Sequence, residues 1–128
     1  MPIDPDREQL GEMASLADAG EGPVVMLNLN RYRDRAEYER YGEVALPVLE
    51  RLGGRVLWHA PARQIVIGAE ADGIDEVIAV WYPSATTFLA FAGDPEIVAA
   101  LEHRRAGLER ATLICCESGA EPVLTPGP

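Results

Sequence analysis

The chain contains one strand–helix–strand unit twice, and this repeat constrains the fold more than any other feature. The first copy, residues 23–59, has the strand PVVMLNLN, an amphipathic segment that ends at Gly53, and the strand RVLWHA. The second copy, residues 75–116, has the strand DEVIAVWYP, helical stretches that begin after Ser84 and Asp94, and the strand ATLICC. Two such units predict a ferredoxin-like α+β sandwich (βαββαβ) with both helices on one face of a four-stranded sheet. The other sheet face then needs a cover, which implies a partner chain or a ligand.

The repeat also predicts how the chain is divided. We expect residues 1–22 to form an appendage with a short helix capped by Asp4, since Pro5 then takes the first helical position. Residues 23–117 are expected to form the ferredoxin-like domain. The proline-rich residues 118–128 are expected to form an extended tail.

Two later segments are predicted as strands. Residues 55–68 read as one interrupted strand or two short ones, RVLWHA and RQIVIG, on either side of Pro61. The last strand is predicted over residues 112–116.

The first strand alternates, and the alternation divides it into two faces. One face is entirely aliphatic, with Val25, Leu27 and Leu29. The other face carries two amides and consists of Val24, Met26, Asn28 and Asn30. We expect the aliphatic face to lie under the helices and the asparagine face to line the open side of the sheet.

Composition excludes several classes of function. The net charge of −10 argues against nucleic acid and anionic membranes, which both need a basic surface. All eleven cationic residues are arginine, so lysine Schiff-base chemistry and a P-loop nucleotide site are excluded. No apolar run reaches the roughly 20 residues that span a bilayer. The polar N-terminal sequence predicts no secretory signal, so a cytoplasmic location is expected.

Motifs for metals and cofactors are absent from the sequence. The chain has two histidines and two adjacent cysteines, Cys115 and Cys116, whose side chains point to opposite faces of a strand. A disulfide between them is therefore not expected, and two thiolates alone do not complete a zinc site. We predict no metal and no cofactor.

A few side chains remain as candidates for chemistry. His103 is a candidate general acid or base, with Arg104 beside it as an anion clamp, although both also suit the C-terminal end of a helix. His59 follows Trp58 at the end of a predicted strand, where it is either functional or structural. The aromatic residues Trp58, Trp81 and Tyr82 lie near strand ends, where they could form a wall of a pocket or pack in a core or dimer.

Several runs together resemble one family: VVMLNLNRYRDRAEY, LERLGGRVLW, DEVIAVWYPSATTFLAF, DPE and HRRAGLERATL. They resemble the domain of unknown function 1330 family, within the dimeric α/β-barrel (ferredoxin-like) superfamily. The resemblance implies a homodimer in which two sheets meet face to face and enclose a barrel. It also implies roles for matching positions, namely Asn28, Arg31, Tyr82–Ser84, Asp94–Pro95 and His103–Arg104.

The chain departs from that family pattern at two positions. Ile74 stands where tryptophan is usual, and Trp81 stands where arginine is usual. A tryptophan there favours a flatter, more apolar or aromatic ligand over an anionic one.

Taken together, these features suggest a small-molecule-binding protein or a cofactor-independent enzyme, monooxygenase-like or isomerase-like, whose pocket lies between sheet and helices or inside a dimer barrel. Asn28 and His103 are the predicted catalytic residues. The predicted substrate-binding residues are Arg31, Trp58, Trp81, Tyr82 and Arg104. A non-catalytic metabolite-sensing or accessory dimer and a purely structural module remain as alternatives.

Overall fold

The structure is a computed structural model that describes residues 3–20 and 22–118. This part of the chain holds a sheet of four strands, one short 3-10 turn and four helices. The strands are β1 (Val24–Tyr32), β2 (Arg55–Pro61), β3 (Glu76–Tyr82) and β4 (Leu108–Glu117). The helices are α1 (Arg7–Asp18), α2 (Arg35–Arg51), α3 (Ala85–Gly93) and α4 (Pro95–Gly107), and the turn is η1 (Glu70–Asp72). None of these helices has the length and apolar character that crossing a membrane requires.

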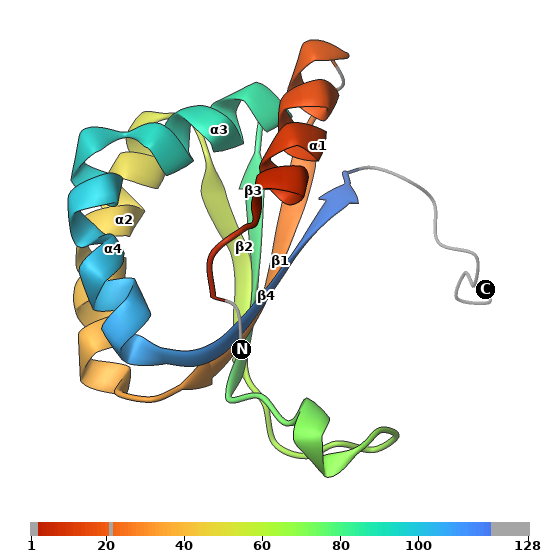
Figure 1. Cartoon of the computed structure of the whole chain (residues 1–128), viewed down its shortest axis with the longest axis vertical. Helices are drawn as coiled ribbons and strands as arrows, with labels where there is room; N and C mark the ends of the chain where they lie inside the picture. Colours follow the sequence, from red (N-terminus) through yellow and green to blue (C-terminus); the bar gives the residue numbers. More distant parts are fainter. Residues whose placement is uncertain (1–2, 21, 119–128) are drawn as a thin grey trace, which may run out of the picture.

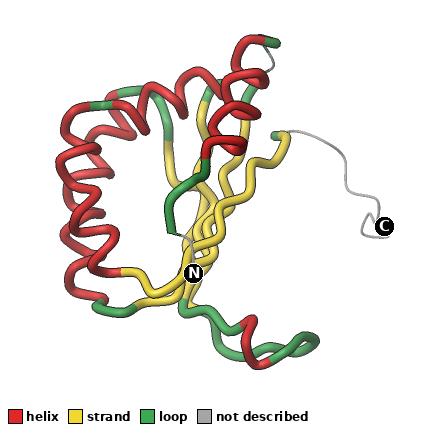
Figure 2. The backbone as a smooth tube through the Cα atoms, in the orientation of Figure 1, coloured by secondary structure: helices red, strands yellow, loops and turns green. Residues whose placement is uncertain are grey.

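The sheet has the order β2-β3-β1-β4, and each strand is antiparallel to its neighbours. Helices α2, α3 and α4 form a layer on one face, and α2 packs along α4 (Figure 1). The opposite face is covered by none of α2, α3 and α4 (Figure 2). This is the ferredoxin-like arrangement that the repeated unit predicts. Helix α1 packs against α3 at one end of the layer.

Local signals in the sequence place the helix ends. The side chains of Asp34, Ser84 and Asp94 accept hydrogen bonds from the first turns of α2, α3 and α4. Each cap satisfies an N–H group that a helix leaves without a partner. Gly53 follows α2 with a φ of +89°, a left-handed conformation that glycine adopts without strain.

Three predicted boundaries were wrong. Asp6, not Asp4, caps α1, because Asp6 accepts from Gln9 N at 2.8 Å and Gln9 Oε1 accepts from Asp6 N at 2.9 Å. This capping box needs a Gln or Glu three residues after the cap, and Asp4 has none. The run RQIVIG is not a strand: it belongs to an exposed loop, with Ile67 95% exposed, because no neighbouring strand pairs with it. Finally, β4 begins at Leu108, directly after α4.

The predicted orientation of β1 was also wrong. Val24 and Met26 lie under the helices, 4% and 2% exposed, within the main apolar core. Asn28 and Asn30 share that face, because side chains two residues apart point the same way. The aliphatic face of Val25, Leu27 and Leu29 is therefore the one without helices. The amides are accommodated in the interior because partners from other elements satisfy them.

The core under the helices joins β1 and β3 to the inner sides of the helices. Its buried members include Val48 and Leu49 of α2, Tyr82 of β3 and Ile97 of α4. At the other end of the same layer, Gly107 packs directly against the backbone of Tyr38. The carbonyl oxygen of Gly107 also accepts from Arg33 N at 2.8 Å and from Asp34 N at 3.1 Å. These contacts fix the start of α2 against the end of α4.

Candidate functional site

A buried carboxylate lies between the sheet and the helices at the start of β3. Glu76 is 3% exposed. Its Oε1 accepts from Asn30 Nδ2 at 3.0 Å, and its Oε2 lies 2.8 Å from His59 Nε2 and accepts from the Tyr32 hydroxyl. Asn30 Nδ2 also donates to the Tyr38 hydroxyl at 3.0 Å. We call this set, Asn30, Tyr32, Tyr38, His59 and Glu76, the interlayer cluster.

The sheet register brings the cluster together. Asn30 of β1 pairs directly with Glu76 of β3, so both side chains project from the same face. On the other side of β3, His59 pairs with Ile78, which shares that face with Glu76. Tyr38 reaches the cluster from the first turns of α2, which the contact with Gly107 positions. The cluster thus combines residues from three strands and one helix.

The tyrosines of the cluster are held in the protonated state. Burial raises the pKa of Tyr32, and the hydrogen bond to Glu76 and its charge raise it further. Burial also raises the pKa of Tyr38, followed by the charge of Glu76, while the charge of Arg104 lowers it. Both phenols therefore remain able to donate a hydrogen bond at neutral pH.

His59 connects the buried carboxylate to solvent. Its side chain is 45% exposed and stands on β2, an edge strand of the sheet. When Nε2 of the neutral ring donates to a carboxylate, the lone pair of the ring lies on Nδ1, which becomes the basic nitrogen. Glu76 therefore orients the His59 ring, as in other carboxylate–histidine pairs.

Two predicted site residues share the helix-covered face with the cluster but lie outside it. Asn28 donates to the carbonyls of Met26 at 3.2 Å and Ile78 at 3.3 Å, so its amide supports the strands. Tyr82 lies at the other end of the layer, where its ring packs edge-on against Phe88 at 5.3 Å. Its buried phenol has a raised pKa.

The other predicted residues are spread over different surfaces. Arg31, Trp58 and Trp81 lie on the sheet face without helices. Arg31 forms an ion pair with Glu109 at 3.2 Å, and the Arg55 guanidinium lies 4.9 Å from the centre of the Trp81 ring.

His103 lies between two helices and on neither face of the sheet. Its Nδ1 lies 2.8 Å from Glu37 Oε2, across the groove between α4 and α2. That groove holds a hollow of about 280 Å³ whose lining includes Val44, Ala99 and His103. His103 and Asn28 are therefore not brought together, whereas Arg104, the next residue along α4, has a charge that reaches Tyr38.

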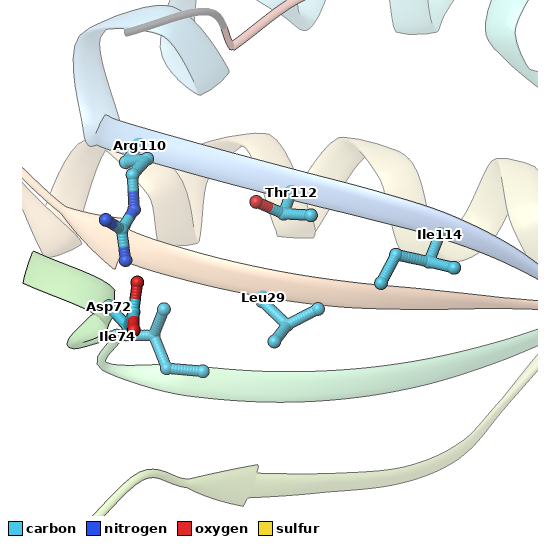
Figure 3. A pocket seen from close by; sticks show the side chains of 6 residues that line it. All are labelled: Leu29, Asp72, Ile74, Arg110, Thr112 and Ile114. Carbon is cyan, nitrogen blue, oxygen red and sulfur yellow. The ribbon is translucent and has the colours of Figure 1, made fainter. Parts of the chain in front are cut away.

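The sheet face without helices has a hollow of about 300 Å³. Figure 3 shows its lining: Leu29, Thr112 and Ile114 project from neighbouring strands, and Asp72, Ile74 and Arg110 lie at one end. Arg110 donates to the carbonyls of Ala71 and Gly73, which ties the η1 loop to β4. Half of the lining is apolar, namely Leu29, Ile74 and Ile114, and the charged residues Asp72 and Arg110 lie together at one end.

Sequence reasoning missed most of the interlayer cluster. Glu76 falls in an apolar strand, on the same face as Ile78, Val80 and Tyr82, and an inward acid of this kind requires partners. That signal was available in the run DEVIAVWY. The partners were not, because Asn30 and Glu76 are 46 residues apart in the chain.

Among the described residues, no group of three or more His, Cys, Asp or Glu side chains is positioned to hold a metal ion. Cys115 and Cys116 are free thiols, as their adjacent positions on one strand predict.

Comparison with known proteins places the chain in a family. The family described as "Domain of unknown function (DUF1330)" matches residues 24–117, and the chain belongs to it. A solved protein of unknown function from Rhodopseudomonas palustris is 34% identical, with a TM-score of 0.85; the match covers 94% of this chain and 98% of that one. No similar sequence was found among curated proteins.

More distant solved structures share the fold alone. A dabb family protein with a ferredoxin-like fold from Mesorhizobium loti has a TM-score of 0.54 at 15% identity, covering 78% of this chain and 100% of that one. The hydroxynitrile lyase of Passiflora edulis has a TM-score of 0.59 at 14% identity, covering 79% and 98%. SnoaB, a cofactor-independent oxygenase from Streptomyces nogalater, has a TM-score of 0.53 at 14% identity, covering 80% and 98%.

Proposed function

We propose that this protein is a small-molecule enzyme of the isomerase-like kind, which works without a cofactor and moves protons at the interlayer cluster. His59 takes a proton from a bound substrate at Nδ1, and the Glu76 carboxylate stabilises the resulting imidazolium. The same imidazolium then returns the proton to another atom of the substrate. The step conserves atoms and electrons, so it needs no oxidant and no metal.

The observation that carries this proposal is the burial of Glu76 together with the exposure of its partner His59. A buried carboxylate is costly unless donors satisfy it, and here Asn30, Tyr32 and His59 all direct polar groups at it. Acid–base residues in enzymes commonly combine a buried charge with a histidine that solvent or substrate can reach. Two proteins of this fold are named as enzymes, a hydroxynitrile lyase and a cofactor-independent oxygenase, which supports catalysis on this scaffold.

We further propose that the protein is a homodimer joined through the sheet face without helices. The aliphatic residues of β1 lie on this face, and Ile114 and Trp58 are about half exposed on it. A second copy would remove this apolar surface from water, which is favourable. The protein of similar fold from Mesorhizobium loti is named a dabb family protein, and dabb stands for dimeric α/β barrel. That name supports such an assembly.

The catalytic proposal can be tested without knowing the product. The protein is incubated in D2O with a panel of small carbonyl compounds, and deuterium incorporation at carbon is followed by NMR. We expect exchange of at least one compound with the wild type, and its loss in His59→Gln and Glu76→Gln. His103→Gln is the matched control and should keep the rate. Equal exchange in His59→Gln would refute the assigned base. Saturable binding with no exchange would favour the metabolite-sensing alternative.

A further inference from the structure

The segment before α1 contacts α4 at an arginine whose side chain is largely buried. Arg104 is 15% exposed; its Nη1 donates to the carbonyl oxygen of Ile3, and it lies 3.8 Å from Asp4 Oδ1. Asp4 Oδ2 accepts from Arg105 Nε at 3.1 Å. We call residues 3–5 the N-terminal strap. In Figure 1 the strap is the dark red segment that leads from α1 toward the label N.

The guanidinium of Arg104 lies near two tyrosines of α2. Its positive charge acts on the phenols of Tyr38 and Tyr41, opposing the effect of burial on the pKa of both. Tyr38 bonds to Asn30, and Asn30 bonds to Glu76. A chain of hydrogen bonds therefore runs from Tyr38 through Asn30 to Glu76 and His59.

We propose that Arg104 binds the carboxylate of the substrate, and that the Ile3 carbonyl and the Asp4 carboxylate occupy this position in the unliganded protein. The proposal rests on the function proposed above and names the substrate class of the same site. The ligand is a small carboxylate whose acid group replaces the strap.

The choice of a carboxylate follows from the chemistry of the guanidinium. Arginine binds carboxylates with two parallel N–H donors, so a free acid satisfies it better than one peptide carbonyl does. Asp4 already shows that a carboxylate comes close to this position, although its own oxygen is engaged by Arg105.

The N-terminal strap competes with a free ligand for Arg104. Residues 3–5 precede the capping residue Asp6, so they can leave Arg104 without any helix moving. A group tethered by a short segment has an effective concentration on the order of millimolar, and it lowers the apparent affinity for a free ligand accordingly. Weakening the strap should therefore tighten ligand binding about three- to tenfold.

The experiment compares benzoate with benzamide, its neutral counterpart, by NMR titration of the full-length protein. We expect benzoate to bind, with shifts at Arg104 and Tyr38, and benzamide to bind much more weakly. Asp4→Asn should tighten benzoate binding about three- to tenfold. Arg105→Gln is the control for loss of one surface charge contact and should have a smaller effect, because the Asp4 carboxylate still lies beside Arg104.

Three results would contradict the proposal. Equal affinity for benzoate and benzamide would show that charge is not recognised. Inorganic phosphate binding as tightly as benzoate would refute the carboxylate assignment. Unchanged affinity in Asp4→Asn would show that the strap does not compete. This last variant changes an exposed residue outside every helix and strand, so its fold should be unaffected.

The catalytic proposal and the carboxylate site at Arg104 can be refuted independently of each other. In Glu76→Gln, proton exchange should be lost while benzoate binding at Arg104 remains within about threefold of the wild type, because Arg104 does not touch Glu76. Benzoate binding without any exchange in the wild type would leave the carboxylate site standing and remove the catalytic proposal. Exchange without benzoate binding would do the reverse.

Discussion

The contact between Gly107 and Tyr38 gives a sharp test of how the site is assembled. A methyl carbon at Gly107 would lie 2.5 Å from Tyr38 N and 2.8 Å from Tyr38 Cα. These are backbone atoms, so α2 and α4 would have to separate. Overpacking of this kind costs about 1–3 kcal/mol. Gly107→Ala is therefore expected to lower the free energy of unfolding by about 2 kcal/mol, despite the better helix propensity of alanine.

Gly42→Ala is the matched control. Gly42 lies inside α2, and a methyl carbon there meets no atom within 4 Å. Alanine in a helix interior is favoured over glycine by about 0.8–1 kcal/mol, so this variant should be more stable than the wild type. Urea unfolding followed by circular dichroism measures both changes. If Gly107→Ala were as stable as Gly42→Ala, the close approach of α2 to α4 would be incorrect.

Three further predictions concern the site, the tyrosines and the assembly. Glu76→Ala should lower the free energy of unfolding by about 3–5 kcal/mol, since it leaves buried donors without a partner. Glu76→Gln should lower it clearly less. If urea unfolding showed no loss of stability in Glu76→Ala, the cluster would be contradicted. All four tyrosines have raised pKa values, so their neutral forms stabilise the fold fully below pH 10, and this contribution is lost as the pH rises through the raised values. Ultraviolet titration should show little tyrosinate at pH 10 while the protein stays folded, and half-ionised tyrosine in folded protein at that pH would contradict the burial. Ile114→Asp should convert a dimer into monomers in analytical ultracentrifugation, whereas Val98→Asp, at an exposed helix position, should leave the assembly unchanged.

The repeated unit was sufficient to predict the sheet, the helix layer and most helix ends, because these depend on local periodicity and capping. The orientation of β1 could not be predicted in the same way. Alternation separates Asn30 from Leu29 but does not say which face the helices cover. The answer depends on Glu76 and Tyr38, which satisfy the Asn30 amide from distant parts of the chain.

The candidate site shows the same limit. In the sequence alone, without Glu76 beside it, nothing distinguishes His59 from a surface histidine. His103 has a neighbouring arginine that favours it as a candidate, yet its ring is paired with Glu37 between two helices. Residue type predicts what a side chain can do, whereas the pairing of β3 with β1 and β2 determines which side chains act together.

The central claim, that the interlayer cluster is where small molecules bind, is tested most directly by mapping a fragment library onto the isotope-labelled protein by NMR. We predict that the bound fragments shift signals of Asn30, Tyr38 and His59. Shifts that instead gather around Leu29, Thr112 and Ile114, with the cluster unaffected, would place the binding site on the other face of the sheet and contradict the claim.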